Sequence, residues 1–317
     1  MGFVVLAAMA GCCRTCPAPA SEPGPLHRYQ FVLLRMGVRV TLTVHATDEP
    51  TARKASAAAF DRIAQIESIA SDWQVNSELS NLSRRAGAGP VRISEELFFL
   101  LARSQALAEQ TDGAFDVTVG PVVQVWRKAR QDRRLPADDE LRRAMELIGW
   151  RKLRLDARQR TADLALPGMK LDLGGIAKGY ACDEALKVLR QHGISSAMCE
   201  AGGDIAVGDA PPGSDAWTIG IPHQGADGRH LILELKNCAV STSGDDFQAL
   251  QMGLRYSHII DPRTGIGLTT RILVTVVAPD GTTADSLSTA ISVLGDKYRS
   301  LLAAHYPNAS VHVKYVR

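Results

Sequence analysis

The sequence is poor in several features that mark large classes of protein. Phe, Trp and Tyr make up only 5% of its 317 residues, so it offers neither an aromatic stacking surface for single-stranded nucleic acid nor a Trp/Tyr belt at a membrane boundary. Its 36 basic and 34 acidic residues nearly balance, which argues against the basic stripe of a nucleic-acid-binding protein. With 45% hydrophobic and 22% charged residues, the composition is that of an ordinary globular domain.

The cysteines do not form a recognisable metal or disulfide pattern in the body of the chain. Cys182, Cys199 and Cys238 are widely spaced, odd in number and without a Cys-x-x-Cys pair, so they indicate neither a zinc site nor a disulfide framework. We expect them to be small buried apolar side chains.

The N-terminus carries a short apolar run, 2–11, that ends at Cys12. The run is too short to cross a bilayer as a helix, and an apolar core followed by small residues is typical of a secretory signal. Met9-Ala10-Gly11-Cys12 resembles a lipobox, in which Cys12 would be lipidated. No Lys or Arg precedes the run, and an uncleaved, frayed terminus is the alternative. A Pro-rich linker follows, so we expect a leader and linker at 1–25 and one domain at 26–317.

Periodicity and capping signals predict interleaved strands and helices. Alternating or β-branched runs predict strands, whereas apolar residues at helical spacing and a Ser before two acids predict helices. Because several strands alternate between apolar and polar residues, we expect an α+β fold rather than a purely parallel sheet. The expected strands are Val38–Val44, Ile272–Ala278 and Val311–Val316, and the expected helices cover Phe60–Ala70, the stretch from Ser94 to Gln110, Ile176–Gln191 and Ala284–Leu294.

A first candidate segment, 111–118, places two carboxylates around a Gly-Ala-Phe turn just after a helix. Asp112 fits an ordinary turn residue that caps with its side chain. Asp116 precedes the strand-like Val117-Thr118-Val119 and is less easily explained by turn chemistry.

A second segment, 171–180, combines Asp172, a Gly174-Gly175 turn and Lys178 at the start of a helix. Backbone amides at a helix N-terminus favour anions such as phosphate, and Lys178 is close enough in sequence to reach one. The segment matches neither the dinucleotide-binding nor the P-loop glycine pattern. Tight packing of a helix on a strand through the two glycines would explain it equally simply.

A third segment places Asp285 and Thr289 four residues apart, on one face of a predicted helix. A carboxylate and a hydroxyl suit a hard cation such as Mg²⁺, which takes oxygen ligands and leaves room for phosphate and water. The alternative is an N-cap Asp with an incidental Thr.

Three further segments are polar. Thr242-Ser243-Gly244-Asp245 suggests a turn, and His258 stands before an Asp261-Pro262 turn, although a lone His is more often structural than catalytic. The charge-dense stretch 127–139 is more typical of a solvated surface than of an anion site.

Taken in order, these segments resemble the thiamine-biosynthesis-lipoprotein-like family of FAD:protein FMN transferases. The matches run from Met36-Gly37 to the last strand, and the full set along most of the chain is far more specific than any one of them. It comprises Ser71-Asp72-Trp73, 77–82, 111–116 with Pro121 and Trp126, Asp172–Tyr180 with Asp183, Ala201-Gly202-Gly203-Asp204, 242–245, 258–265, and Ala284-Asp285 with Thr289.

The resemblance implies a T-fold-like α+β domain and a set of site residues. Met36 and Trp73 would line the flavin or adenine pocket, and His258 would be a candidate for catalysis beside Ile259 and the nucleotide. Lys178 would lie near the pyrophosphate, and it and Asp285 would take part in catalysis. FAD would also be held by Ala114, Phe115, Asp116, Asp172, Thr242 and Ser243, and Mg²⁺ by Asp285, the Thr289 hydroxyl and the Gly175 carbonyl.

The implied reaction transfers FMN from FAD to a Thr or Ser hydroxyl of an acceptor flavoprotein, with Mg²⁺ and release of AMP. The acceptor would be a subunit of a membrane redox complex or a respiration factor. The enzyme would be an exported lipoprotein on the periplasmic side of the inner membrane. Two departures, Val38 in place of Thr and Asp245-Asp246-Phe247 in place of Asp-Tyr, put acceptor fit in doubt more than the reaction. A flavin-binding carrier or a Mg²⁺-dependent FAD pyrophosphatase are the alternatives.

Overall fold

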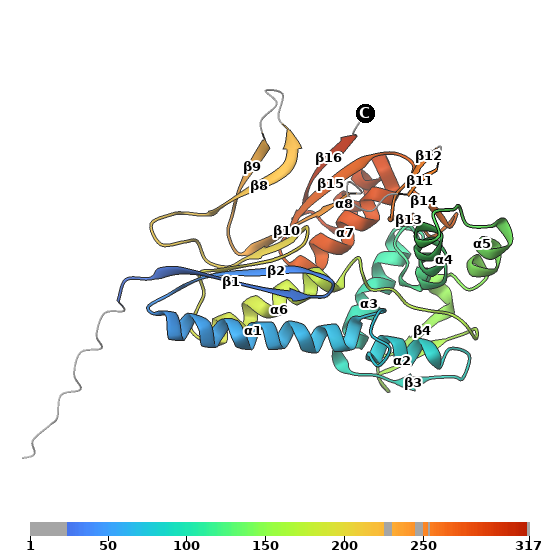
Figure 1. Ribbon diagram of the computed structural model, residues 1–317, viewed down its shortest axis with the longest axis horizontal. Coiled ribbons are helices and arrows are strands. Elements are labelled where there is room, and N and C mark those ends of the chain that lie inside the picture. Colours follow the sequence, from blue (N-terminus) through green and yellow to red (C-terminus); the bar gives the residue numbers. More distant parts are fainter. Residues whose placement is uncertain (1–23, 225–229, 245–249, 253, 316–317) are drawn as a thin grey trace, which may run out of the picture.

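The fold is built on an antiparallel seven-stranded sheet with helices on one face (Figure 1). The computed structural model describes residues 24–224, 230–244, 250–252 and 254–315. The strand order of the large sheet is β1-β2-β6-β7-β10-β15-β16, and every neighbouring pair is antiparallel. The expected α+β class with interleaved strands and helices is confirmed.

Within the described residues, the strands form this sheet and four small ones. The large sheet contains β1 (His27–Arg35), β2 (Val38–Ala46), β6 (Ala197–Ala201), β7 (Asp204–Val207), β10 (Cys238–Ser243), β15 (Ile272–Ala278) and β16 (Ser310–Tyr315). The small sheets pair β3 (Val91–Arg92) and β4 (Leu153–Asp156) with β5 (Thr161–Leu164), β8 (Trp217–Gln224) with β9 (His230–Leu235), β11 (Leu250–Met252) with β12 (Leu254–Tyr256), and β13 (Ile260–Asp261) with β14 (Ile266–Gly267).

The α-helices of the described residues range from 7 to 22 residues in length. They are α1 (Glu49–Ala70), α2 (Glu78–Arg84), α3 (Glu95–Gln110), α4 (Gly120–Gln131), α5 (Asp138–Met145), α6 (Ala177–Gln191), α7 (Gly281–Leu294) and α8 (Tyr298–His305), with 3₁₀ turns η1 (Val117–Val119), η2 (Trp150–Lys152) and η3 (Gly295–Lys297). Among the residues that the structure describes, no helix combines the length and the apolar character needed to cross a bilayer.

Helices α1, α6 and α7 cover one face of the large sheet and bury the main core against it (Figure 1). The alternation of β2 and β10 explains how: Leu42 and Ala239 point into this core, while Val240 points to the other face. There the hairpin β8–β9 packs through Trp217 and Ile219 on a second, smaller core. Strands β6, β7, β10 and β15 of the large sheet therefore separate two apolar layers.

A group of helices and short strands lies beyond one end of the large sheet (Figure 1). Its core joins α4, α5 and the segments β11–β13 around Trp126, whose indole N–H donates to the Gly265 carbonyl at 2.8 Å. At this same end of the large sheet lie the β1–β2 turn at Met36-Gly37, the β6–β7 turn at Gly202-Gly203 and the end of β10.

Most predicted elements are present, with three corrections. The strand-like Val117–Val119 is a 3₁₀ turn, because the Asp116 carboxylate accepts from the Thr118 backbone N–H at 2.8 Å and caps it. Thr242 and Ser243 are not a turn but the last residues of β10, paired with β15. The helix expected from Ala284 begins at Gly281, capped by Asp280. Asp285 is therefore inside the helix, and its alternative interpretation as an N-cap is wrong.

The structure also tests the expectations for Asp112 and for the cysteines of the body of the chain. Asp112 is a turn residue, with its backbone in the left-handed region at φ 46°. Cys182 and Cys199 are buried free thiols and Cys238 is a half-buried one. The predicted leader and Cys12 lie outside the described residues.

Candidate active site

A lysine held between two buried carboxylates lies where α6 and α7 meet β7. The Lys178 ammonium is 2.9 Å from Asp204 Oδ2 and 3.5 Å from Asp285 Oδ2, and it donates to the Gly174 carbonyl at 3.1 Å. Asp204 and Asp285 are only 4% and 2% exposed. We call these three residues the Lys178 triad. Sequence positions 178, 204 and 285 are thus brought together by the fold.

Burial and mutual proximity shift the pKa values of Lys178 and Asp285. Burial alone would lower the pKa of Lys178, but Asp204 and Asp285 outweigh it and raise that pKa. Burial, reinforced by the charge of Asp204, raises the pKa of Asp285 to about 7, although Lys178 acts in the opposite direction. The lysine therefore remains a fixed positive charge in a site with low access to water.

Glycines at the α6–α7 crossing allow Asp285 to reach the start of α6. A Cβ on Gly179 would lie 2.0 Å from the Gly281 carbonyl oxygen, so no other residue fits there without moving the helices. As a result the Gly179 N–H donates to Asp285 Oδ2 at 3.0 Å. This tight packing joins two helices at Gly179 and assembles the charged site. It is not the packing of a helix on a strand through Gly174 and Gly175.

Hydroxyl groups line the β10 side of this site. Ser243 Oγ lies 2.6 Å from Ser288 Oγ and 3.4 Å from Thr289 Oγ1, and Ser241 donates to Asp204 Oδ1 at 2.5 Å. Across from them, a Cβ on Gly175 would stand 3.0 Å from Thr289 Oγ1. The predicted metal-ligating residues Gly175, Asp285 and Thr289 therefore share one small oxygen-rich region.

A second charged cluster surrounds Arg127 of α4. Its guanidinium forms ion pairs with Asp72 and with Asp172, the latter at 3.2 Å, and its Cζ lies 4.0 Å from the ring centroid of Trp73. Burial, and then the charge of Asp72, raises the pKa of Asp172, with Arg127 opposing. Asp172 also accepts from the Gly174 N–H at 2.8 Å, which connects this cluster to the glycine turn of the Lys178 triad.

The 114–116 segment lies against the same turn. The Val117 carbonyl accepts from the Asp172 N–H at 2.8 Å, while Ala114 and Phe115 are almost completely buried. Asp116 is 6% exposed, and Thr118 donates to it from both backbone and hydroxyl. Burial raises the pKa of Asp116 against these hydrogen bonds. Its carboxylate thus has a structural function, and its predicted contact with FAD stays a prediction.

The remaining predicted residues are more dispersed. Met36 is half-buried in the β1–β2 turn with φ 52°, and Trp73 is 72% exposed. His258 is half-buried beside the buried Ile259, just before β13. The roles of Met36, His258 and Ile259 in binding or catalysis stay predictions.

Two functional candidates were not assigned from the sequence. Asp204 directly follows Gly202-Gly203, and Asp172 lies shortly before Gly174-Gly175. This shared proximity of an acid to two glycines is the sequence signal that could have pointed to Asp204. Arg127 belongs to the stretch that we expected to be a solvated surface. That expectation holds for exposed residues such as Lys128 and Arg133 but is wrong for Arg127.

Comparison with known proteins gives a consistent picture. A model of the ApbE family matches residues 36–312. An FAD:protein FMN transferase of Treponema pallidum is 34% identical over 265 residues, covering 78% of this chain and 73% of that protein. A protein of the same name from Klebsiella pneumoniae is 30% identical over 272 residues, covering 84% and 83%.

The fold agrees with a solved structure as well. The flavin transferase ApbE from Vibrio cholerae superimposes with a TM-score of 0.81 at 28% identity, covering 92% of this chain and 94% of that one. The family match spans strands β2 to β15 of the large sheet, the Lys178 triad and the Arg127 cluster, and from this agreement we conclude that the chain belongs to the ApbE family.

Proposed function

We propose that this protein is an FAD:protein FMN transferase that moves FMN from FAD to a Thr or Ser hydroxyl of an acceptor flavoprotein. The relatives from Treponema pallidum and Klebsiella pneumoniae bear that name. The observation that carries the proposal is the Lys178 triad at a glycine turn, since a fixed cation beside helix-start amides suits a pyrophosphate.

The donor set around Asp285 fits Mg²⁺. It consists of oxygens alone: the Asp285 carboxylate, the Thr289 hydroxyl and the Gly175 carbonyl, with Ser243 beside Thr289. Within the described residues no three His, Cys, Asp or Glu side chains gather around one point that could hold a metal. Such a sparse set matches an ion that completes its shell with phosphate oxygens and water. When bound, Mg²⁺ would supply positive charge for the phosphoryl transfer.

The chain's own residues account for positioning and charge. Lys178 presents a permanent positive charge toward the leaving phosphate, and Asp204 holds the ammonium in place. The acceptor oxygen forms a bond to the FMN phosphorus as the bond from that phosphorus to the AMP oxygen breaks. Positioning and electrostatics supply most of the rate in such reactions. His258 and the triad carboxylates are the candidate groups for receiving the hydroxyl proton.

The flavin side of the site is assigned to the Arg127 cluster. Stacking on Arg127 fixes the plane of the exposed Trp73 ring, and a fixed, exposed aromatic plane is suited to another flat ring system. Asp172, paired with Arg127, faces the same region. We assign Trp73 and Asp172 to contacts with FAD.

We also propose that the protein is exported and anchored through a lipid on Cys12, on the periplasmic side of the inner membrane. The support is the short apolar run that ends in Met9-Ala10-Gly11-Cys12. Metabolic labelling with a radioactive fatty acid would test it. Label on the wild type and none on a Cys12→Ala variant is expected, and label on both or neither would contradict it.

The activity is tested by mass spectrometry of a carrier protein bearing an acceptor Thr, incubated with the protein, FAD and Mg²⁺, with and without EDTA. A Mg²⁺-dependent mass gain equal to FMN is expected, lost in Asp285→Ala. Asp296→Ala is the matched control, because this exposed carboxylate lies just beyond α7 and away from the triad. Free FMN and AMP without an adduct would indicate a pyrophosphatase, and bound FAD without turnover a carrier.

A further inference from the structure

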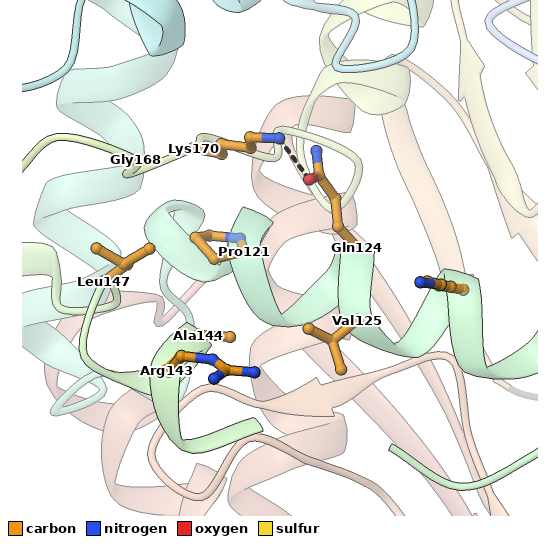
Figure 2. Close-up of a pocket in the computed structure, with 9 residues that line it drawn as sticks. Pro121, Gln124, Val125, Arg143, Ala144, Leu147, Gly168 and Lys170 are labelled. Carbon is orange, nitrogen blue, oxygen red and sulfur yellow. Dashed lines mark hydrogen bonds between the residues drawn. The ribbon is translucent and has the colours of Figure 1, made fainter. Parts of the chain in front are cut away.

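A shallow groove of about 340 Å³ lies between α4, α5 and the segment before Asp172 (Figure 2). Its floor is apolar, with Pro121, Val125 and Leu147 among the lining residues. Lys170 and Gln124 stand at one rim and Arg143 at the other, as Figure 2 shows. The groove is not part of the site described above, and the proposed reaction does not use it.

The charge of this groove has one sign. Lys128, Arg143 and Lys170 line it, and no acidic residue is among its lining residues. Lys170 donates to Gln124 at 2.5 Å and Arg143 pairs at 2.7 Å with Asp139, which lies outside the groove. Three cations around an apolar floor are complementary to a ligand that carries both carboxylates and apolar side chains.

The groove is continuous with the candidate active site along α4. Gln124 contacts Lys170, and one turn later Arg127 contacts Asp172, two residues after Lys170. The helix and the 170–172 segment therefore run side by side from the groove to the FAD side of the site. A chain lying in the groove would lead toward the Arg127 cluster.

We propose that this groove binds an acidic, partly apolar segment of the acceptor protein, next to the hydroxyl that receives FMN. The proposal rests on the proposed transferase function. Its size suits a few side chains rather than a whole domain, so the groove would select the acceptor by the charge of a short segment. Exposed ion pairs contribute modestly, so we expect a moderate effect on affinity that weakens as salt is raised.

The first test uses two fluorescein-labelled peptides of equal length, one alternating Glu with Leu and the other Lys with Leu. Fluorescence anisotropy with the full chain is expected to show binding of the Glu peptide only. The double variant Lys128→Glu, Lys170→Glu should weaken it about tenfold, as two reversed charges imply. The matched control is Arg142→Glu, an exposed residue of α5 that does not line the groove and should bind as the wild type does.

The second test measures FMN transfer to two carriers whose acceptor Thr is followed by the Glu–Leu or the Lys–Leu sequence. The Glu–Leu carrier is expected to have the lower KM with an unchanged kcat, and the double variant should remove the difference. Equal KM values for both carriers, or equal binding of both peptides, would overturn the groove assignment while the transferase stands. If the wild type is a dimer and the double variant is a monomer, the groove binds a second copy of this chain, and the assignment to the acceptor is overturned. No adduct on either carrier would count against the transferase, whereas the peptide measurement would still decide the groove.

Discussion

Two of the described clusters that place one cation between two carboxylates, around Lys178 and around Arg62, differ in their surroundings. Lys178 lies between Asp204 and Asp285 beside a glycine turn and a row of hydroxyls. Arg62 of α1 pairs with Glu96 of α3 and with Glu184 of α6, the latter at 2.6 Å. We call the latter three residues the Arg62 triad.

The difference lies in depth and neighbours rather than in charge. The Lys178 triad carboxylates are 3–5% exposed at the side chain, whereas those of the Arg62 triad are 14–28% exposed. The Arg62 triad joins three helices, and Tyr180 donates to Glu96 within it. Such a cluster therefore serves the stability of the fold where water screens its carboxylates and helices surround it. It becomes a candidate catalytic group where its carboxylates are buried beside a glycine turn. The two cations themselves are similarly exposed, Lys178 at 25% and Arg62 at 19% of the side chain.

The largest expected effect comes from removing the two cations. Lys178→Met should lower kcat/KM for FMN transfer by about 10³-fold, comparable to loss of a single charge-stabilising donor. Arg62→Met should leave transfer per folded molecule unchanged. Steady-state assays corrected for the folded fraction would measure both. Similar losses in the two variants would remove the distinction between the triads.

The triads should respond to pH with opposite signs. Asp285 has a pKa of about 7 in the folded protein, against roughly 4 in the unfolded chain. The metal-free native state thus holds a proton that the unfolded chain releases, and stability is lost as pH rises from roughly 4 through 7. At about 1.4 kcal/mol per pKa unit, the loss is at most about 4 kcal/mol.

Glu184 acts in the reverse direction. Burial alone would raise its pKa, but hydrogen bonds from Lys187 and Arg62 outweigh it and hold the pKa below its usual range. Its contribution is present above the unfolded pKa, roughly 4.3, and is lost as pH falls further. Urea denaturation in EDTA would measure both effects. Asp285→Asn should remove the loss toward neutral pH and Glu184→Gln the loss toward acid. A slope unchanged in Asp285→Asn would contradict the first.

Neutralising one acid of each triad gives a smaller contrast. Asp204→Asn should lower kcat by about 10- to 100-fold, as for residues that orient a functional group, because it leaves Lys178 less firmly positioned. Asp204→Glu should recover part of the rate, whereas a merely structural carboxylate would give no such rescue. Glu184→Gln is the matched control and should keep the wild-type kcat. Equal kcat in all three would mean that Asp204 does not act through Lys178.

Although Arg62→Met should not affect transfer, it should lower the free energy of unfolding. Arg62→Met leaves Glu96 and Glu184 facing each other without their cation. Breaking a fully buried pair costs 3–5 kcal/mol, but these side chains are partly solvated, so we expect a loss of about 1–2 kcal/mol. Urea denaturation at pH 7 would measure it. Arg53→Met, which breaks an exposed pair with Glu49 within α1, is the control and should change little.

Local sequence signals predicted the elements well because they report on local physics. Ser94 caps α3 by accepting from the Leu97 N–H, and the β-branched run Ile272–Ala278 is a buried strand. The Asp285–Thr289 spacing also held, since four residues along a helix bring two side chains to one face. Each of these inferences required only neighbours in sequence.

What could not be predicted depends on contacts between distant residues. Asp204 reaches Lys178 only because β7 lies beside α6, and no spacing in the sequence encodes that distance. In the sequence, Arg127 looks like its charged neighbours. The fold places it between Asp72, which lies 55 residues earlier in the chain, and Asp172, which lies 45 residues later. Thr242 and Ser243 look like a turn because both are polar, yet both end a strand. Ser243 faces the site, whereas the Thr242 hydroxyl contacts Thr275 on the other face of the sheet.

Arg127 provides the smallest and most discriminating comparison, since its cluster shares features of both triads. Like Arg62 it joins separate elements, but it also stacks on a Trp73 ring that is 72% exposed. If that ring meets FAD, losing the stack should cost about 0.5–1 kcal/mol of binding, or roughly two- to fivefold in the Kd for FAD.

Quenching of flavin fluorescence on Arg127→Ala and Arg127→Lys would measure this change. Lysine retains the charge but not the flat guanidinium or its paired donors, so it should restore only part of the affinity. An unchanged Kd for FAD together with a lower Tm would mean that Arg127, like Arg62, stabilises the fold and does not organise the site. A weaker Kd at an unchanged Tm would place it with Lys178, because only a group that organises the ligand side of the site changes binding without changing the fold.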